Sequence, residues 1–196
     1  MPLYAWPIAA LRWVRITHGP AGDRLQLYSL GDCKVLLCGA DGGAVDLDPY
    51  DNPQEGVLRA EIARLRAEGI VDGPERQARL LPILRARRAF QNTAPHPATL
   101  CLRPNGTFQA RTAEAIAPPG AAVLVVSDGF YRLVDTYAIH TPASLAARCT
   151  GQGLQAALDE LRRFEAQAAG AAAASASVKR ADDASAVLWR AGLVAR

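Results

Sequence analysis

The run Ala122-Val123-Leu124-Val125-Val126-Ser127-Asp128-Gly129-Phe130-Tyr131 contains the strongest fold signal in the chain. Its first five residues are apolar and mostly β-branched, which is typical of a short strand buried on both faces. The strand ends at Asp128-Gly129, and a carboxylate at the tip of a buried strand is held rigidly, as metal-binding and catalytic acids must be. From this stretch alone a second interpretation is equally open: Ser127 or Asp128 caps a helix that begins near Phe130.

The composition predicts one globular domain that spans residues 1–196, with half of its residues hydrophobic and a formal net charge of +3. The Arg85-Ala86-Arg87-Arg88 cluster lies in a helical pattern, which is more typical of a solvated face than of a nucleic-acid patch. No apolar run has the length of a membrane span, and the first residues lack the order of a secretory signal. We therefore expect a cytoplasmic protein without nucleic-acid or membrane partners.

The cysteines and histidines give no metal or disulfide signature. The four cysteines lack CxxC spacing, and we interpret them as small buried hydrophobic residues in a reducing cytoplasm. The three histidines are scattered, and we assign them no chemistry.

Hairpins dominate the strand signals. Asp41-Gly42-Gly43 joins two apolar runs, and Pro104-Asn105-Gly106 is expected to join residues 99–103 to residues 107–111 in the same way. Gly31-Asp32 is expected to turn the chain from one strand into the next. The predicted strands cover residues 13–17, 25–30, 34–38, 44–47, 99–103, 107–111, 122–126 and 184–190.

Helical spacing is concentrated in the middle of the chain and after residue 127. The predicted helices cover residues 2–11, 52–69, 75–90 (with Pro82 kinking or dividing it), 130–135, 141–151 and 153–168. Residues 169–178 form an alanine-rich segment, expected to be a flexible loop. Grouped helices and strand hairpins favour an α+β fold in which helices cover antiparallel sheets.

The acidic residues Asp32, Asp128, Asp182 and Asp183 share one context, because each lies next to the end of a predicted strand. Carboxylates without histidine or thiolate partners favour hard cations such as Mg²⁺ or Mn²⁺. Two such ions about 3.5–4 Å apart can hold a nucleophilic water and clamp a phosphate oxyanion. Acidic residues are also common in turns, so the spacing alone leaves a structural role open.

Three motifs resemble those of the PP2C-like (PPM-type) metal-dependent serine/threonine phosphatases, in the family's order. Gly31-Asp32-Cys33-Lys34 resembles the Gly-Asp-Ser-Arg turn, and Ser127-Asp128-Gly129-Phe130 resembles the Ser-Asp-Gly-[Leu/Phe/Ile] motif. Asp182-Asp183-Ala184-Ser185 is similar to the terminal Asp-Asn-x-[Ser/Thr] motif, in a form seen in bacterial members. Each motif is short, but their order, spacing and strand contexts make the combination fairly specific.

The resemblance implies an α-β-β-α sandwich of two antiparallel sheets with metal ions at one edge. By position, Asp128 and Asp182 match metal-binding aspartates of the family. Asp32 matches a position that in several members helps to hold a third, looser metal. Asp183 stands where the family usually has asparagine, so we expect it and Gly129 beside the ligands rather than among them. No catalytic residue is assigned beyond these positions.

The chain also departs from the family pattern. Family members begin with a strand that carries an arginine, then a Glu-Asp pair and an Asp-Gly-x-Gly-Gly motif, which supply bridging carboxylates and the phosphate-binding arginine. No segment before Leu30 contains these motifs, although Arg12 and Arg15 lie near the first predicted strand. The resemblance therefore covers only the C-terminal two thirds of a family domain, and we expect an N-terminally incomplete fold and an incomplete two-metal site that binds metals poorly.

Three functions follow from these observations. The resemblance implies hydrolysis of phosphoserine or phosphothreonine on proteins by a metal-activated water, with Mg²⁺ or Mn²⁺ as cofactor and a phosphoprotein as substrate. The alternative is an inactive protein of the same fold that binds a phosphoprotein or a kinase partner. The third is an unrelated α+β domain in which the acids serve as caps and turns.

Overall fold

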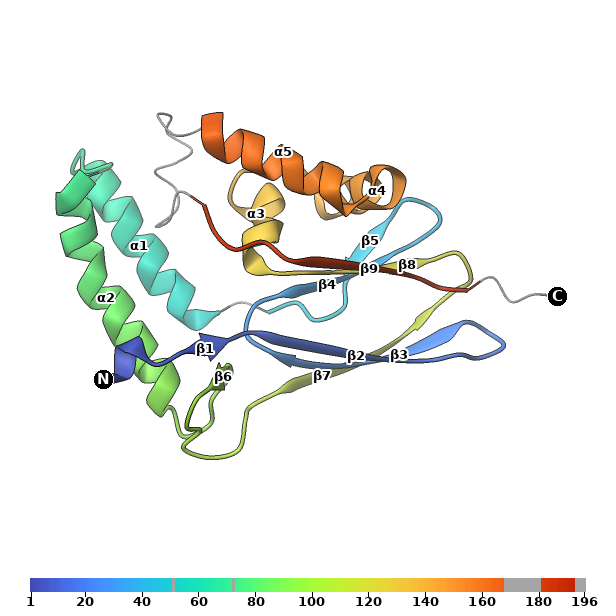
Figure 1. The fold of residues 1–196 in the computed structure, drawn as a ribbon, viewed down its shortest axis with the longest axis horizontal. Helices are drawn as coiled ribbons and strands as arrows, with labels where there is room; N and C mark the ends of the chain where they lie inside the picture. Colours follow the sequence, from blue (N-terminus) through green and yellow to red (C-terminus); the bar gives the residue numbers. More distant parts are fainter. Residues whose placement is uncertain (51, 72, 168–180, 193–196) are drawn as a thin grey trace.

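The computed structural model, which describes residues 1–50, 52–71, 73–167 and 181–192, has two antiparallel sheets packed face to face (Figure 1). One sheet has four strands in the order β5-β4-β8-β9, and the other has three in the order β2-β3-β7. The first consists of β4 (Lys34–Cys38), β5 (Ala44–Asp46), β8 (Ala122–Val126) and β9 (Ala186–Arg190). The second consists of β2 (Leu11–Thr17), β3 (Asp23–Leu30) and β7 (Arg111–Ala117), and β1 (Ile8–Ala9) pairs separately with β6 (Leu100–Cys101).

Three helices cover the outer face of the four-stranded sheet (Figure 1): α3 (Asp128–Asp135), α4 (Pro142–Gln152) and α5 (Leu154–Gln167). The helices α1 (Pro53–Ala67) and α2 (Gly73–Thr93) form a hairpin beside the sandwich, with a small core of its own. The 3₁₀ turn η1 (Leu3–Ala5) is tied to α2, because the Asn92 amide donates to the Leu3 carbonyl at 3.1 Å. None of the helices described here is long and apolar enough to cross a membrane. The α+β prediction is confirmed.

Strand β8 is buried on both faces, as its composition predicts. Val123 is 2% exposed and belongs to the core between the two sheets, together with Leu25 of β3. Leu124 is fully buried on the opposite face, in the core shared with Phe130 and Leu133 of α3. One strand therefore contributes alternate side chains to both cores of the domain.

Gly31 and Asp32 carry the chain from one sheet to the other. β3 ends at Leu30 in the three-stranded sheet, whereas β4 begins at Lys34 in the four-stranded sheet. Gly31 has a φ of +78°, and a Cβ atom there would lie 2.7 Å from the Cβ atom of Ala10. Only glycine fits this crossover without strain.

The predicted hairpin across Pro104-Asn105-Gly106 is wrong. β6 pairs with β1, whereas the next strand, β7, begins only at Arg111 and pairs with β3. The Asn-Gly turn chemistry is local, so it does not determine which distant strand each flanking segment meets.

The helix predicted for residues 2–11 is also wrong, since this segment forms η1, β1 and the start of β2. Pro7 cannot donate a helical hydrogen bond and interrupts a helix there.

By contrast, α2 continues through Pro82 as one helix. The hairpin at Asp41-Gly42-Gly43 is confirmed as the β4–β5 connection. The alanine-rich segment 169–178 lies outside the described residues.

Two valines on neighbouring strands test the burial of β8. Val123→Ala removes two methyl groups from the core between the sheets, and we expect the free energy of unfolding to fall by about 2 kcal/mol. Val187 of β9 is 63% exposed, so Val187→Ala should change it by less than about 0.5 kcal/mol. Urea unfolding of both variants measures the difference, and equal losses would contradict the two-sided burial of β8.

Candidate functional site

The Ser-Asp-Gly motif forms the junction between β8 and α3. The side chain of Ser127 accepts a hydrogen bond from the Phe130 amide at 3.3 Å, so Ser127 is the N-cap of α3. The helix begins at Asp128, one position later, and the Asp128 side chain is exposed. Of the two candidate caps, the structure thus selects Ser127, and Asp128 lies in the first turn of the helix.

The segment that precedes β9 lies directly against this junction. The Ser127 amide donates to the Ser185 carbonyl at 2.9 Å, and the Ser185 amide donates to the Ser127 hydroxyl at 3.0 Å. At Gly129, an added Cβ atom would lie 3.0 Å from the carbonyl carbon of Asp183 and 3.2 Å from the Cβ atom of Asp182. The structure therefore brings Asp182 and Asp183 to the N-terminus of α3, next to Asp128.

The Gly-Asp crossover borders the same junction through Cys33. Lys34, which follows Cys33, pairs with Val126 at the end of β8, and the Asp128 backbone lies near the Cys33 thiol. Burial raises the pKa of this thiol, and the nearby charges of Asp32 and Asp128 raise it further, whereas the charge of Arg12 opposes the increase. Asp32, which is half-buried, thus lies on the loop adjacent to Asp128. All three acidic motifs meet at one edge of the four-stranded sheet.

Two arginines fix the Gly-Asp crossover by its backbone. Arg12 Nε donates to the Cys33 carbonyl at 2.8 Å, and Arg111 Nη2 donates to the Gly31 carbonyl at 2.7 Å. Both arginines also form ion pairs with Asp48, at 2.7 Å and 2.8 Å. Arg12 Nη1 lies at ion-pair distance from Asp48 but without the alignment of a hydrogen bond.

Sequence reasoning missed this Arg12–Asp48–Arg111 triad. Asp48 and Arg111 belong to none of the motifs, and Arg111 is 63 residues from Asp48 along the chain. One signal was present: Arg12 stands in alternation with Val14 and Ile16, which face the core between the sheets. A charged residue at such a position implies a buried partner.

Asp48 is almost completely buried, with 8% of its side chain exposed. Burial by itself raises the pKa of this carboxyl, but the hydrogen bond from Arg111 and the charge of Arg12 outweigh burial and hold the pKa below its usual value of 3.8. Burial lowers the pKa of Arg12, which the charge of Asp48 counteracts. The carboxylate therefore stabilises the folded state while it is ionised.

Asp48→Asn should lower the free energy of unfolding by about 3 kcal/mol at pH 7, because the buried guanidinium group of Arg12 and the half-buried one of Arg111 lose their carboxylate. Since the folded-state pKa is lowered, this contribution is present above pH 3.8 and is lost as the pH falls below that value. Urea unfolding should show that the difference in free energy of unfolding between wild type and variant is smaller at pH 3 than at pH 7. Asp159→Asn, at an exposed site, is the control; a difference for Asp48→Asn independent of pH would contradict this role.

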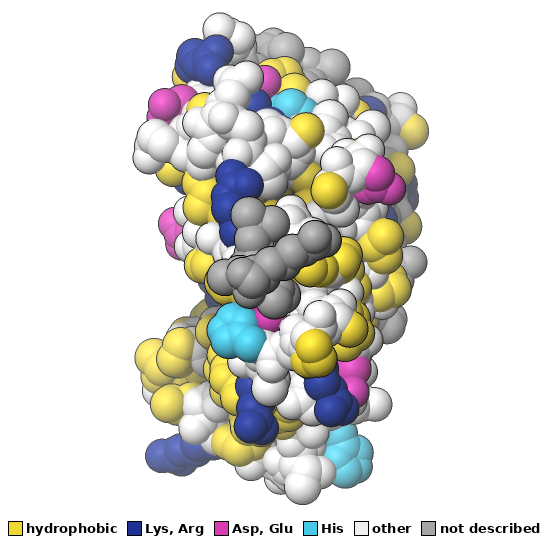
Figure 2. Space-filling model, turned by 90° about the vertical axis from the view of Figure 1, so that its right-hand side faces the viewer, with side chains coloured by type: hydrophobic (Ala, Val, Ile, Leu, Met, Phe, Trp, Pro, Cys, Tyr) yellow, Lys and Arg dark blue, Asp and Glu magenta, His cyan; other side chains and the backbone are white. Residues whose placement is uncertain are grey.

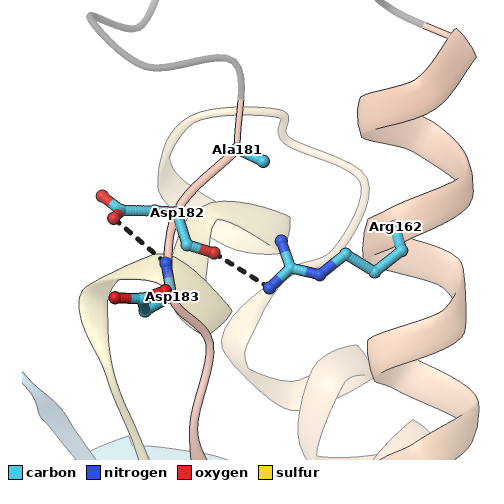
Figure 3. Close-up of a pocket in the computed structure, with 4 residues that line it drawn as sticks. All are labelled: Arg162, Ala181, Asp182 and Asp183. Atoms are coloured by element: carbon cyan, nitrogen blue, oxygen red, sulfur yellow. Dashed lines mark hydrogen bonds between the residues drawn. The ribbon is translucent and has the colours of Figure 1, made fainter.

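A pocket of about 400 Å³ lies beside the junction, lined by Arg162, Ala181, Asp182 and Asp183 (Figure 3). The Asp182 carboxylate accepts a hydrogen bond from the Asp183 amide at 3.0 Å, and Arg162 lies on the opposite wall (Figure 3). The Arg162 guanidinium group is bonded to the Asp182 carbonyl and to Glu165, whereas the carboxylates of Asp182 and Asp183 point away from it (Figure 3).

The carboxylates fit Mg²⁺ or Mn²⁺ by chemistry, because hard oxygen donors are the ligands that these ions prefer. By number they supply only part of a coordination shell. Within residues 1–50, 52–71, 73–167 and 181–192, no three or more His, Cys, Asp or Glu side chains form a group that could hold a metal ion. The roles of Asp128, Asp182 and Asp32 as metal ligands therefore stay predictions.

Comparison with known proteins finds structural likeness at low sequence identity. The chain is similar to PppA, a key regulatory component of T6SS in Pseudomonas aeruginosa, with 12% identity over 92% of this chain and 56% of that chain, and a TM-score of 0.48. It is also similar to the Mycobacterium tuberculosis serine/threonine phosphatase PstP/Ppp, with 17% identity over 93% of this chain and 59% of that chain, and a TM-score of 0.42.

A third similar structure is the catalytic domain of the serine/threonine phosphatase PstP in complex with 2 manganese ions, with 17% identity, coverage of 93% and 58%, and a TM-score of 0.43. The chain thus spans between 56% and 59% of the length of these three structures. No family model and no curated protein matches the sequence.

The close approach at Gly129 gives a test of the junction. Gly129→Ala would place a methyl group against the Asp183 backbone, and we expect a loss of about 1–3 kcal/mol in the free energy of unfolding. Gly151 of α4 has no neighbouring atom within 4 Å of an added Cβ, so Gly151→Ala should instead stabilise by about 0.5–1 kcal/mol. Thermal unfolding measures the stability of both variants. An unchanged stability of Gly129→Ala would contradict the close contact between Gly129 and the Asp183 backbone.

Proposed function

We propose that this chain supplies the Asp128–Asp182 part of a PP2C-like phosphatase site, which hydrolyses phosphoserine or phosphothreonine on proteins. One observation carries the proposal: Gly129, the neighbour of Asp128, packs against the Asp183 carbonyl and the Asp182 Cβ atom, although Asp128 and Asp182 are 54 positions apart in the sequence. The Gly31-Asp32 crossover borders the same place. Three motifs that resemble those of one enzyme family thus converge at one sheet edge in the order and context that the family uses.

The residues of this chain have distinct roles in the proposed site. Asp128 and Asp182 offer the carboxylates that would hold Mg²⁺ or Mn²⁺, with Asp32 as a weaker contributor. When bound, such ions lower the pKa of a coordinated water and stabilise the phosphate oxyanion. Ser127 fixes Asp128 by capping α3, whereas Asp183 and Gly129 place the backbone beside the ligands.

Asp128→Asn tests the proposal because it keeps the shape of the side chain and removes its charge. In the purified chain, we expect Mn²⁺ affinity, measured by isothermal titration calorimetry, to fall at least tenfold, or about 1.4 kcal/mol. Any Mn²⁺-dependent hydrolysis of p-nitrophenyl phosphate should be lost in the same variant. Asp159→Asn, at an exposed position of α5, should leave both unchanged. Equal affinity in wild type and Asp128→Asn would contradict the assignment of Asp128.

A second candidate function is supported by the small number of carboxylates at the junction. Asp128 and Asp182 are the only two residues expected to be main ligands, which is few for a site with two metal ions. The same surface can therefore serve a phosphatase-fold protein that binds a phosphoprotein or a kinase partner without hydrolysing phosphate. Phosphopeptide binding that proceeds without phosphate release, at saturating Mn²⁺, would favour this function over hydrolysis.

A further inference from the structure

A buried ion network lies beneath the Asp182–Asp183 pocket. The side chain of Glu165, on α5, is 5% exposed and accepts hydrogen bonds from Arg132 of α3 at 3.3 Å and from the Tyr137 hydroxyl at 3.4 Å. Its second carboxylate oxygen accepts one from Arg162 Nη1 at 2.6 Å. The glutamate thereby fixes the direction of the Arg162 guanidinium group from below.

Arg162 extends this network outward to the candidate ligand segment. Its Nη2 atom donates to the backbone carbonyl of Asp182 at 2.9 Å (Figure 3). Pairing with the β8–α3 junction begins at Asp183, whose carbonyl accepts a hydrogen bond from the Ser127 hydroxyl at 3.5 Å, and continues at Ser185. The bond from Arg162 is made directly to the Asp182 backbone, and Gly129 packs against the Asp183 carbonyl and the Asp182 Cβ atom.

We propose that Arg162 is a positioning residue that holds Asp182 beside Asp128 by bonding to its carbonyl oxygen. The inference rests on the proposed role of Asp182 as a metal ligand. The planar guanidinium group suits this task because its two terminal nitrogens bind Glu165 and Asp182 at once, which fixes one relative to the other. Arg162 thus connects the buried core of the helix layer to the site.

The sign of the effect on metal binding separates positioning from simple charge. Arg162 is a cation near carboxylates, so its removal by electrostatics alone would strengthen cation binding. Loss of positioning acts in the opposite direction, because residues that orient metal ligands typically contribute tenfold or more to affinity. For Arg162→Met we expect Mn²⁺ affinity, measured by calorimetry, to fall about tenfold.

Two further variants complete the comparison. Arg162→Lys keeps the charge but lacks the fork that reaches both acceptors, so its affinity should lie between those of wild type and Arg162→Met. Arg163→Met removes an exposed neighbouring arginine from the same helix and should leave the affinity unchanged. Unchanged or tighter Mn²⁺ binding in Arg162→Met would overturn the inference.

A readout without metal keeps this inference separate from the proposed function. In the metal-free protein, hydrogen exchange at the Asp183 and Ser185 amides should accelerate about tenfold in Arg162→Met and stay at the wild-type rate in Arg163→Met. If wild type fails to bind Mn²⁺, the proposed function fails while the exchange rates still decide the role of Arg162. Identical exchange rates in wild type and Arg162→Met would overturn the positioning role of Arg162.

Discussion

Burial of β8 on both of its faces is the constraint on which the rest of the structure depends. β8 pairs with β4 on one side and with β9 on the other, so its backbone groups are engaged along both edges. Each fully buried valine or leucine contributes about 1.5–3 kcal/mol, and a shift of one residue would exchange the side chains of the two cores. The register is therefore fixed, and with it the point at which Ser127 and Asp128 leave the sheet.

The acidic loops around that point are held by arginines that bind backbone carbonyl oxygens. Arg12 and Arg111 hold the crossover next to Asp32, and Arg162 holds the segment that contains Asp182. Each set is anchored by one buried carboxylate, Asp48 in the first and Glu165 in the second. A hydrogen bond to the main chain fixes the position of a residue through its backbone. The side chain at that position therefore stays available for other interactions.

The central strand and the Asp41 hairpin were predictable from the sequence, because they depend on local composition and turn chemistry. That the acidic motifs would lie at one edge was implied only by the family resemblance. β7 was missed because its inward positions, Ala113, Ala115 and Ala117, are small and give only a weak alternation of hydrophobicity. The partner of β6 was mispredicted because strand pairing is set by the whole sheet. The Arg12–Asp48–Arg111 triad joins residues up to 80 positions from the crossover they hold, and no local pattern encodes such contacts.

The arginines and carboxylates around the junction between β8 and α3 are unequal in number. The two networks contain four arginines, Arg12, Arg111, Arg132 and Arg162, and two carboxylates, Asp48 and Glu165. The four acids of the motifs, Asp32, Asp128, Asp182 and Asp183, reverse this positive surplus when all are ionised. Among these residues alone, carboxylates then outnumber guanidinium groups by two. Strand pairing and backbone hydrogen bonds hold these acids at one sheet edge, and in the proposed site a divalent cation would offset their negative charge.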